Sequence, residues 1–273
     1  MIPVAMLLQI ATSPGQTFAV SAFTPFLRES LELSDSQLSL AYMLGTLLAA
    51  LPLMLVGPLS DRYGLRGISL IAIGMLAAAC YFAANVTNFY SLLAAFFLLR
   101  FLGQGSLSLL SGNAISMWFR NRIGRVSAAM SIGTAIAFAW IPEWLHGSII
   151  AIGWRGTYEW LAIIVAASML PIVFFLFCNR PEDIGQTVDG NAEISPDLSP
   201  DACDVTDSCL TLRQAIQSRA FSILAASNTV WAMAGTGIVF YLFTLCNDLG
   251  FEATVPASLF KTCLLYTSDA ADE

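Results

Sequence analysis

The sequence predicts an all-α membrane protein that crosses a bilayer several times. Three observations lead to this prediction: 57% of the 273 residues are hydrophobic, only 11% are charged, and the mean hydropathy is +0.72. Soluble domains carry about 25% charged residues. The composition therefore argues against a soluble enzyme, a disordered chain and a nucleic-acid-binding protein, and the net charge of −7 also opposes binding to a phosphate backbone.

Seven stretches have the length of a membrane span, which is about 20 mostly apolar residues. The uncharged run from 67 to 99 is too long for one crossing, and polar residues at 85–88 divide it. The first stretch has no basic start and is longer than a signal-peptide core, which favours a span over a cleaved leader. Seven such stretches favour membrane spans over buried helices of a soluble core. The predicted spans cover residues 2–27, 36–60, 67–84, 89–118, 126–150, 160–177 and 220–245, and an eighth begins near residue 253.

Lysine and arginine are distributed unevenly between the two predicted sides. With the N-terminus in the cytoplasm, eight of the twelve basic residues lie in cytoplasmic segments, three lie outside and Arg100 lies within a span. Cytoplasmic loops carry the excess of basic residues in multi-pass proteins. We therefore expect an integral membrane protein with a cytoplasmic N-terminus, and the plasma membrane is the favoured location.

The composition changes abruptly after the sixth predicted span. Eight of the nineteen acidic residues lie within 182–207, among prolines and few large apolar residues. This pattern predicts an acidic cytoplasmic linker at 179–219, between a six-span bundle at 1–178 and the start of a second bundle at 220–263. The polar string at 264–273 resembles translated adapter sequence, so we expect a non-native tail on a fragment of a longer protein.

The turn between the second and third predicted spans carries a dense motif of glycine and charged residues. Gly57 permits close contact between helices, and Gly64 suits a turn with positive φ. Asp61 suits a helix N-terminus or a partner arginine, while Arg62 and Arg66 suit the anionic inner leaflet or a carboxylate. An ordinary basic turn explains the arginines but not the whole spacing. The motif is Gly57-Pro-Leu-Ser-Asp61-Arg62-Tyr-Gly64-Leu-Arg66-Gly67.

This motif resembles the signature of the major facilitator superfamily, Gly-x-x-x-Asp-Arg-x-Gly-x-Arg-Arg, with Gly67 in place of the last arginine. Residues 100–105 resemble the arginine-containing fourth span of that family. Residues 179–185 resemble the linker start of monocarboxylate-transporter-like and oxalate/formate-antiporter-like members, although the first span lacks the lysine of many monocarboxylate transporters. The resemblance implies a transporter with two six-helix halves, alternating access, and a loop that acts as a cytoplasmic latch, docked partly on the second half. The alternative is a non-transporting sensor or scaffold, or an inactive truncated fragment.

Polar side chains form a stripe on each of two predicted spans. At 100° per residue, one face of the fourth span presents polar side chains within roughly 80°. An arginine inside a span costs about 2.5–3.5 kcal/mol, so Arg100 is expected to face water, a carboxylate or the solute, or to tune a proton carrier. The alternative is an arginine satisfied by backbone carbonyls or by Glu143. The stripes comprise Arg100, Gln104, Ser108 and Ser111 on the fourth span, and Gln9, Ser13 and Gln16 beside the Pro14-Gly15 break on the first.

Three further polar residues have two interpretations each. Glu143 and His146, near the outer end of the fifth span, form either a protonatable pair or, as we favour, a solvated helix end. Asn228 in the seventh span lies either on the cavity or on a helix-packing face. With one histidine, no phosphate-binding loop and no Cys/His cluster, we expect no enzyme activity, cofactor or metal. The expected partners are a small solute, an organic anion or monocarboxylate, and the lipid bilayer, with the proton as a candidate coupling ion.

Overall fold

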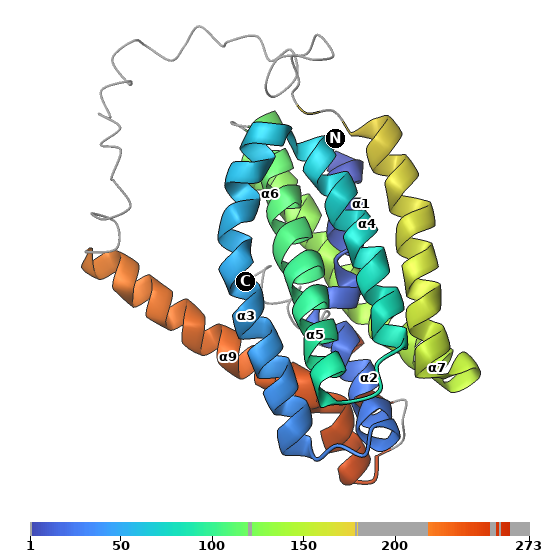
Figure 1. Cartoon of the computed structure of the whole chain (residues 1–273). Helices are drawn as coiled ribbons and strands as arrows, with labels where there is room; N and C mark the ends of the chain where they lie inside the picture. The colour runs from blue at the N-terminus through green and yellow to red at the C-terminus, as the bar shows by residue number, and fades with distance from the viewer. Residues whose placement is uncertain are drawn as a thin grey trace, which may run out of the picture.

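The computed structural model describes residues 2–119, 122–177, 179, 218–251, 255–256 and 258–262. Within these residues every regular element is helical, which confirms the all-α prediction (Figure 1). Most of the predicted linker and all of the predicted tail at 264–273 lie outside the described residues.

The first span is a broken helix. Helix α1 (Ile2–Ile10) is followed by a single 3-10 turn, η1 (Ser13–Gly15), and by α2 (Thr17–Ser30). Pro14 has no amide hydrogen and cannot continue the preceding helix, and the backbone is extended at Gln16 (φ −79°, ψ 148°). The Pro14-Gly15 break expected from the sequence is therefore present, and it divides the span near its middle.

Capping side chains and a glycine set the limits of the next two helices. Ser34 and Gln37 form a reciprocal capping box at the start of α3 (Asp35–Tyr63). Helix α3 ends at Gly64, whose φ of 83° reverses the chain into α4 (Leu65–Ala84).

The fourth span changes its helical type in the middle. Asn88 caps α5 (Phe89–Leu99), the segment η2 (Arg100–Leu107) is a π-helix, and α6 (Ser108–Trp118) resumes the α-helical pattern. A π-helix is wider than an α-helix because each N–H bonds to the fifth preceding carbonyl. Side chains on either side of η2 are therefore rotated relative to the positions that a continuous α-helix would give them.

The fifth and sixth spans are the two antiparallel legs of α7 (Ile123–Leu176). The 54-residue element turns back at Gly153, where φ is 79° and ψ is 163° (Figure 1). The seventh predicted span is α9 (Arg219–Asp248). Among the described residues, five helices are long and apolar enough to cross a membrane. Because α7 has two legs and α1 and α2 together make a broken span, a helical segment is present for each of the seven predicted spans.

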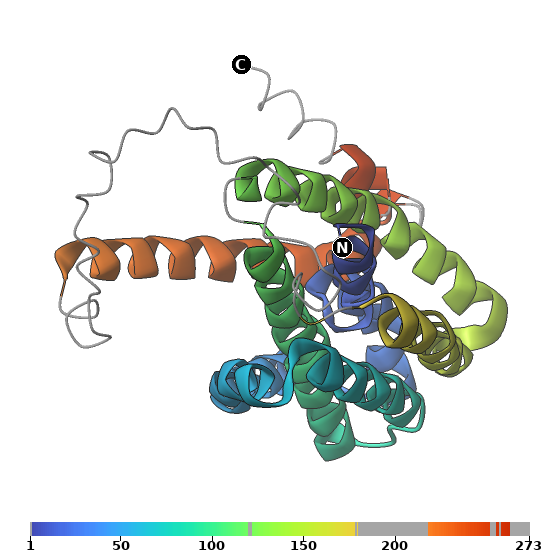
Figure 2. The ribbon, with the colours of Figure 1, turned by 90° about the horizontal axis from the view of Figure 1, so that it is seen from above.

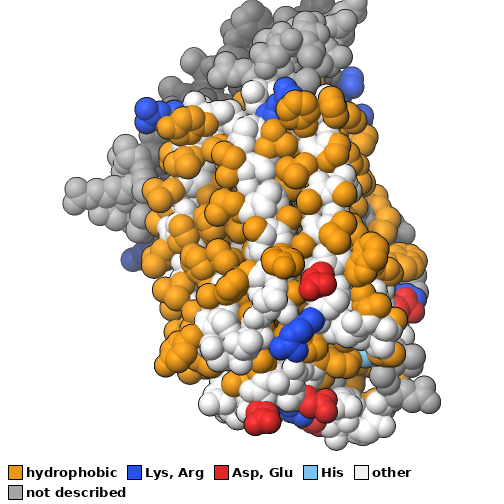
Figure 3. Space-filling model, turned by 45° about the vertical axis from the view of Figure 1, so that its right-hand side comes forward, with side chains coloured by type: hydrophobic (Ala, Val, Ile, Leu, Met, Phe, Trp, Pro, Cys, Tyr) orange, Lys and Arg blue, Asp and Glu red, His pale blue; other side chains and the backbone are white. Residues whose placement is uncertain are grey.

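The spans of the first bundle pack around a continuous apolar core, and α9 joins this bundle at one end only. Its last turns bury Phe240 and Phe243 against α2 and α3, whereas residues 219–235 are exposed and project away from the bundle (Figures 1 and 2). Hydrophobic side chains cover the flank of the molecule, and charged side chains gather toward its two ends (Figure 3). This surface is that of a helical bundle embedded in lipid.

Candidate functional site

The first and fourth spans cross at two glycines in the middle of the bundle. A Cβ atom on Gly15 would lie 2.2 Å from the carbonyl oxygen of Leu99 and 2.9 Å from Cα of Gly103. A Cβ on Gly103 would in turn lie 2.9 Å from Cα of Gly15. Because real Cβ atoms do not approach backbone so closely, only glycine allows η1 and η2 to cross here.

Arg100 begins the π-helical segment beside this crossing, and only 7% of its surface is exposed. Its Nη1 donates to the carbonyl oxygen of Gly15 at 3.3 Å and to Oγ1 of Thr17 at 3.2 Å. The guanidinium also lies over the ring of Tyr42, 5.1 Å from its centroid. In the part of the chain that the structure describes, no carboxylate pairs with Arg100, so its positive charge is held by neutral groups alone.

Two stacked aromatic rings, Tyr42 of α3 and Phe240 of α9, lie between Arg100 and the backbone of α9. The hydroxyl of Tyr42 donates to Oγ1 of Thr17 at 2.9 Å, which fixes the ring over the guanidinium. The opposite face of Tyr42 stacks on Phe240 of α9, with centroids 4.3 Å apart. Phe240 thus covers Tyr42, and Tyr42 covers Arg100.

A cavity of about 510 Å³ lies between α1, α6 and the first leg of α7. From the two predicted stripes it brings together Gln9, Ser108 and Ser111. The Ser111 hydroxyl donates to the carbonyl oxygen of Ala5 at 3.0 Å, which ties α6 to α1. Its size and the hydrogen-bonding side chains in its largely apolar lining are compatible with a small solute.

The first leg of α7 contributes three further hydroxyl groups to this cavity, and the sequence analysis missed them. They are Ser127, Ser131 and Thr134. Their spacing of four and three residues places them on one face of a helix, which is the signal that would have identified them. Weakly polar hydroxyl residues are common in spans, so the spacing stands out less than an arginine does.

The remaining residues of the two stripes lie apart from the cavity. Gln16 donates through Nε2 to Oγ1 of Thr12 at 3.0 Å, and Ser13 bonds to the carbonyl oxygen of Ile10. Gln104 lies at the glycine crossing, where its buried Oε1 has no hydrogen-bond partner among the described residues. Asn228 lies on the projecting part of α9 and bonds to the carbonyl oxygen of Leu224 at 3.0 Å, so it is not part of this site.

The signature loop packs against the end of the sixth span. The backbone N–H of Arg66 donates to Oδ1 of Asn179 at 2.8 Å, and its side chain donates to the carbonyl oxygen of Phe174 and lies over the ring of that residue. A Cβ on Gly64 would lie 3.1 Å from Nδ2 of Asn179. The loop motif and the start of the predicted linker, which the sequence analysis treated separately, are thus in direct contact.

The other residues of the signature loop make fewer contacts. Asp61 and Arg62 are exposed, and Arg62 lies over the neighbouring ring of Tyr63. A Cβ on Gly57 would meet no atom within 4 Å among the described residues, so the close helix contact expected at Gly57 does not occur within the described part of the chain.

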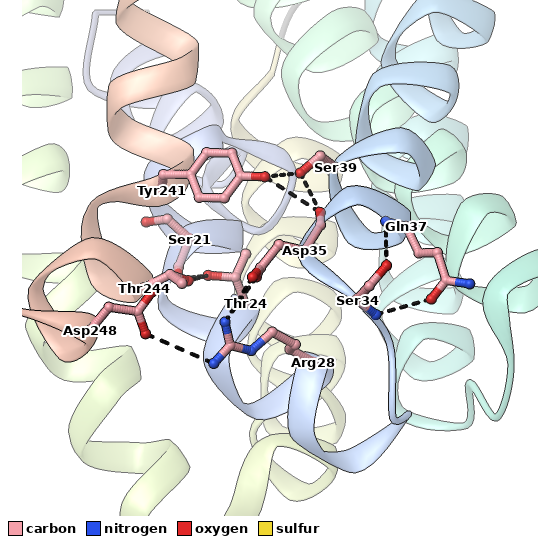
Figure 4. Close-up of polar contacts among 10 residues, drawn as sticks. All are labelled: Ser21, Thr24, Arg28, Ser34, Asp35, Gln37, Ser39, Tyr241, Thr244 and Asp248. Carbon is pink, nitrogen blue, oxygen red and sulfur yellow. Dashed lines mark hydrogen bonds and ion pairs between the residues drawn. The ribbon is translucent and has the colours of Figure 1, made fainter.

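At the opposite end of the bundle, polar contacts join α2 and α3 to α9 (Figure 4). Arg28 pairs with Asp35 at 2.9 Å and with Asp248 of α9 at 4.0 Å. The hydrogen bond and the charge of Asp35 raise the pKa of the Arg28 guanidinium, which lies past the predicted span, above its ordinary value. Two hydroxyl pairs continue this contact, Ser39 with Tyr241 and Thr24 with Thr244.

Glu143 and His146 have different surroundings in the structure. Glu143 is half exposed and forms an ion pair with Lys261 at 2.5 Å, so it is not the partner of Arg100. His146 instead packs between two aromatic rings, with both ring nitrogens buried. The expectation of a solvated helix end is therefore wrong for His146, because the last turns of α9 cover that position.

Seven apolar crossings, a glycine contact between broken spans and a buried arginine define a polytopic helical membrane protein with a central polar site. Comparison with known proteins gives the class a name. The family model of the Major Facilitator Superfamily matches residues 5–267, and the chain belongs to this superfamily. It is also similar to the MFS-type transporter oryN of Aspergillus oryzae, with 31% identity over 121 residues that cover 44% of this chain and 24% of that relative. The match therefore spans about a quarter of the relative's length.

Proposed function

We propose that this chain is the first half, with the beginning of the second, of a secondary active transporter for a small organic anion. The observation that carries this proposal is Arg100: a buried guanidinium held by neutral groups keeps a net positive charge in the middle of the bundle. Such a charge attracts an anion, which supplies the missing negative partner. The hydroxyl-lined cavity beside α6 offers hydrogen bonds to the polar part of the solute.

The domain boundaries of the proposal follow the composition. The first bundle comprises residues 1–178, the linker 179–219, and the second bundle begins within 220–263. The excess of basic residues at the signature-loop end supports a cytoplasmic location for that end and for the N-terminus. The plasma membrane is the proposed location.

The proposed mechanism is alternating access, in which the two halves rock about a central site. Contacts between the first bundle and α9 at the end opposite the signature loop hold that outer end closed in the structure. Because Phe240 stacks on Tyr42, separating α9 from α3 would uncover the face of Tyr42 that lies opposite Arg100. Residues Arg66 and Asn179 would brace the cytoplasmic end.

The finer assignment to monocarboxylate-transporter-like or oxalate/formate-antiporter-like carriers rests on residues 179–185 and on the buried arginine. A monocarboxylate fits a single uncompensated guanidinium, because a bidentate pair satisfies both ions. We propose the proton as the coupling ion, since a proton carried with the anion would neutralise the charge that crosses the membrane.

Uptake of radiolabelled monocarboxylates into proteoliposomes tests the proposal. The assay compares this chain with a form whose reading frame extends through a complete second bundle. We expect saturable uptake by the extended form, a loss of at least about tenfold for Arg100→Gln, and partial retention for Arg100→Lys. Arg125→Gln, at an exposed arginine near the start of α7, is the matched control and should leave uptake unchanged. Equal uptake by Arg100→Gln and the wild type would refute the role of Arg100.

The second candidate function is a sensor or scaffold that binds a solute without moving it. The long exposed part of α9 is compatible with a docking role for this helix. Binding of the labelled anion to the extended form in detergent, without uptake into proteoliposomes, would favour this candidate over a carrier.

A further inference from the structure

A second, smaller pocket lies at the outer end of the bundle, between the two halves of the proposed carrier. Its volume is about 210 Å³, and it is enclosed by α2, the first leg of α7, the end of α9 and residues 255–256. The residues that matter for its chemistry are His146, Glu29 and Asn247, together with the rings of Phe26 and Phe243. None of these residues belongs to the cavity beside α6.

His146 lacks the hydrogen bonds that its ring requires. Both ring nitrogens are buried, and neither has a partner among the residues that the structure describes. The ring centroid lies 6.0 Å from that of Phe26 and 5.5 Å from that of Phe243. A neutral imidazole carries one donor and one acceptor, so two polar groups without partners face this pocket. The pocket is large enough to hold water, but neither nitrogen is exposed to it in the structure.

We propose that His146 is a proton-binding site in this interface, and that its protonation favours separation of α9 from the first bundle. The proposal rests on the alternating access proposed above and names the group that would bind the coupling proton. A proton from the outer solution binds the unprotonated ring nitrogen when a fluctuation of the interface admits water to it. The imidazolium then has two donors and a full charge, and neither ring nitrogen has a hydrogen-bond partner among the described residues.

The charged groups around His146 determine the direction of the effect. On α2, Glu29 lines the pocket; on α7, Glu143 is paired with Lys261 of the segment 258–262; on α9, Asp248 is paired with Arg28. Two of these carboxylates already have a cation, which leaves Glu29 as the carboxylate without an ion pair among the described residues that line the pocket. Glu29 is exposed, so water screens its attraction. While the interface is closed, the imidazolium of His146 loses more from its lost hydration than it gains from attraction to Glu29. When the interface is open, water hydrates the protonated ring, so protonation favours the open form.

Distance measurements by pulsed electron paramagnetic resonance on this chain in lipid nanodiscs test the proposal. Spin labels are attached to Tyr90→Cys, at the outer end of α5, and to Leu249→Cys, just past α9, with the six native cysteines replaced by alanine. Spectra are compared at about pH 7.5 and about pH 5.5, on either side of the ordinary histidine pKa of about 6.5. We expect the population at long distance to grow about threefold or more at the lower pH.

Three variants separate the proton site from other titrations. His146→Gln retains hydrogen bonding without a titratable group and should abolish the pH response. His146→Phe fills the aromatic site and should do the same, which guards against a folding defect in either variant. Glu29→Gln removes the stabilising carboxylate and should enlarge the response.

The two proposals fail in different ways in these experiments. A pH response that persists in both His146 variants, or an absent response in the wild type, would overturn the proton site whatever the uptake assay shows. A His146-dependent response without uptake in proteoliposomes would instead leave the proton site in place and refute the carrier.

Discussion

The glycine crossing of the first and fourth spans makes a strong prediction about stability. In Gly15→Ala the new Cβ would lie 2.2 Å from the Leu99 carbonyl oxygen, 1.2 Å short of the 3.4 Å at which ordinary contact begins. Its other close neighbours, the Gln104 nitrogen and Gly103 Cα, are also backbone atoms and cannot rotate away. Overpacking costs about 1–3 kcal/mol, and backbone neighbours place this variant at about 3 kcal/mol.

Thermal unfolding in detergent, followed by the fluorescence of the six tryptophans, measures this cost. At about 2–4 °C per kcal/mol for a chain of this size, we expect Gly15→Ala to unfold about 6–12 °C below the wild type. The control is Gly74→Ala on α4, where a Cβ would meet nothing within 4 Å. The Gly74→Ala control should be about 0.5–1 kcal/mol more stable than the wild type, because alanine favours a helix more than glycine does. If the two variants unfold at the same temperature, the spans do not cross at Gly15.

Three further substitutions test local features by the same unfolding assay. Gly64→Ala forces a side chain into a backbone with φ 83° and ψ 144°, and should lower stability by about 2 kcal/mol; an unchanged unfolding temperature would contradict the turn. Ser34→Ala removes the capping box of α3 and should cost about 1 kcal/mol, whereas Ser36→Ala two residues later should cost almost nothing. Tyr42→Phe loses the hydrogen bond to Thr17 but keeps its ring, so we expect a loss of about 1 kcal/mol, and a loss above about 3 kcal/mol would show that the ring had moved.

The spans and their breaks follow from the sequence because their causes are local. Apolar length determines where a helix can cross lipid, and the Pro14-Gly15 pair breaks the first span wherever it is placed. The positive φ of Gly64 likewise follows from a loop too short for any other turn. These features need no knowledge of the neighbouring helices.

The π-helix could not be predicted in this way. A regular period of 100° per residue places Arg100 and Ser108 on a common face, yet only Ser108 lines the cavity. The wider turn of η2 occurs where Gly15 of another span presses on Leu99 and Gly103. This contact joins segments far apart in the sequence, and such a contact leaves no periodic signal in either one.

His146 illustrates the same limit at the end of the bundle opposite the signature loop. The neighbours of His146 in its own helix predict the solvated end of a span, since Pro142 precedes it and Glu143 lies one turn away. Its burial depends on Phe26 and Phe243, which come from α2 and α9. The sequence therefore identified a titratable residue but not the apolar surroundings that give it a possible function.

The polar contacts at the two ends of the bundle join different segments of the chain. At the signature-loop end, Arg66 and Asn179 join segments on the first-bundle side of the linker, so they can persist while the halves move. At the other end, Arg28 and Asp248 join the first bundle to α9, and in the proposed mechanism this pair would have to separate when that end opens. An exposed pair at 4.0 Å contributes little free energy, about 0–1 kcal/mol. If the two halves alternate as proposed, aromatic and hydroxyl contacts are the main contacts that hold the outer end closed, and we expect a charge placed among them to shift the balance between the two proposed states.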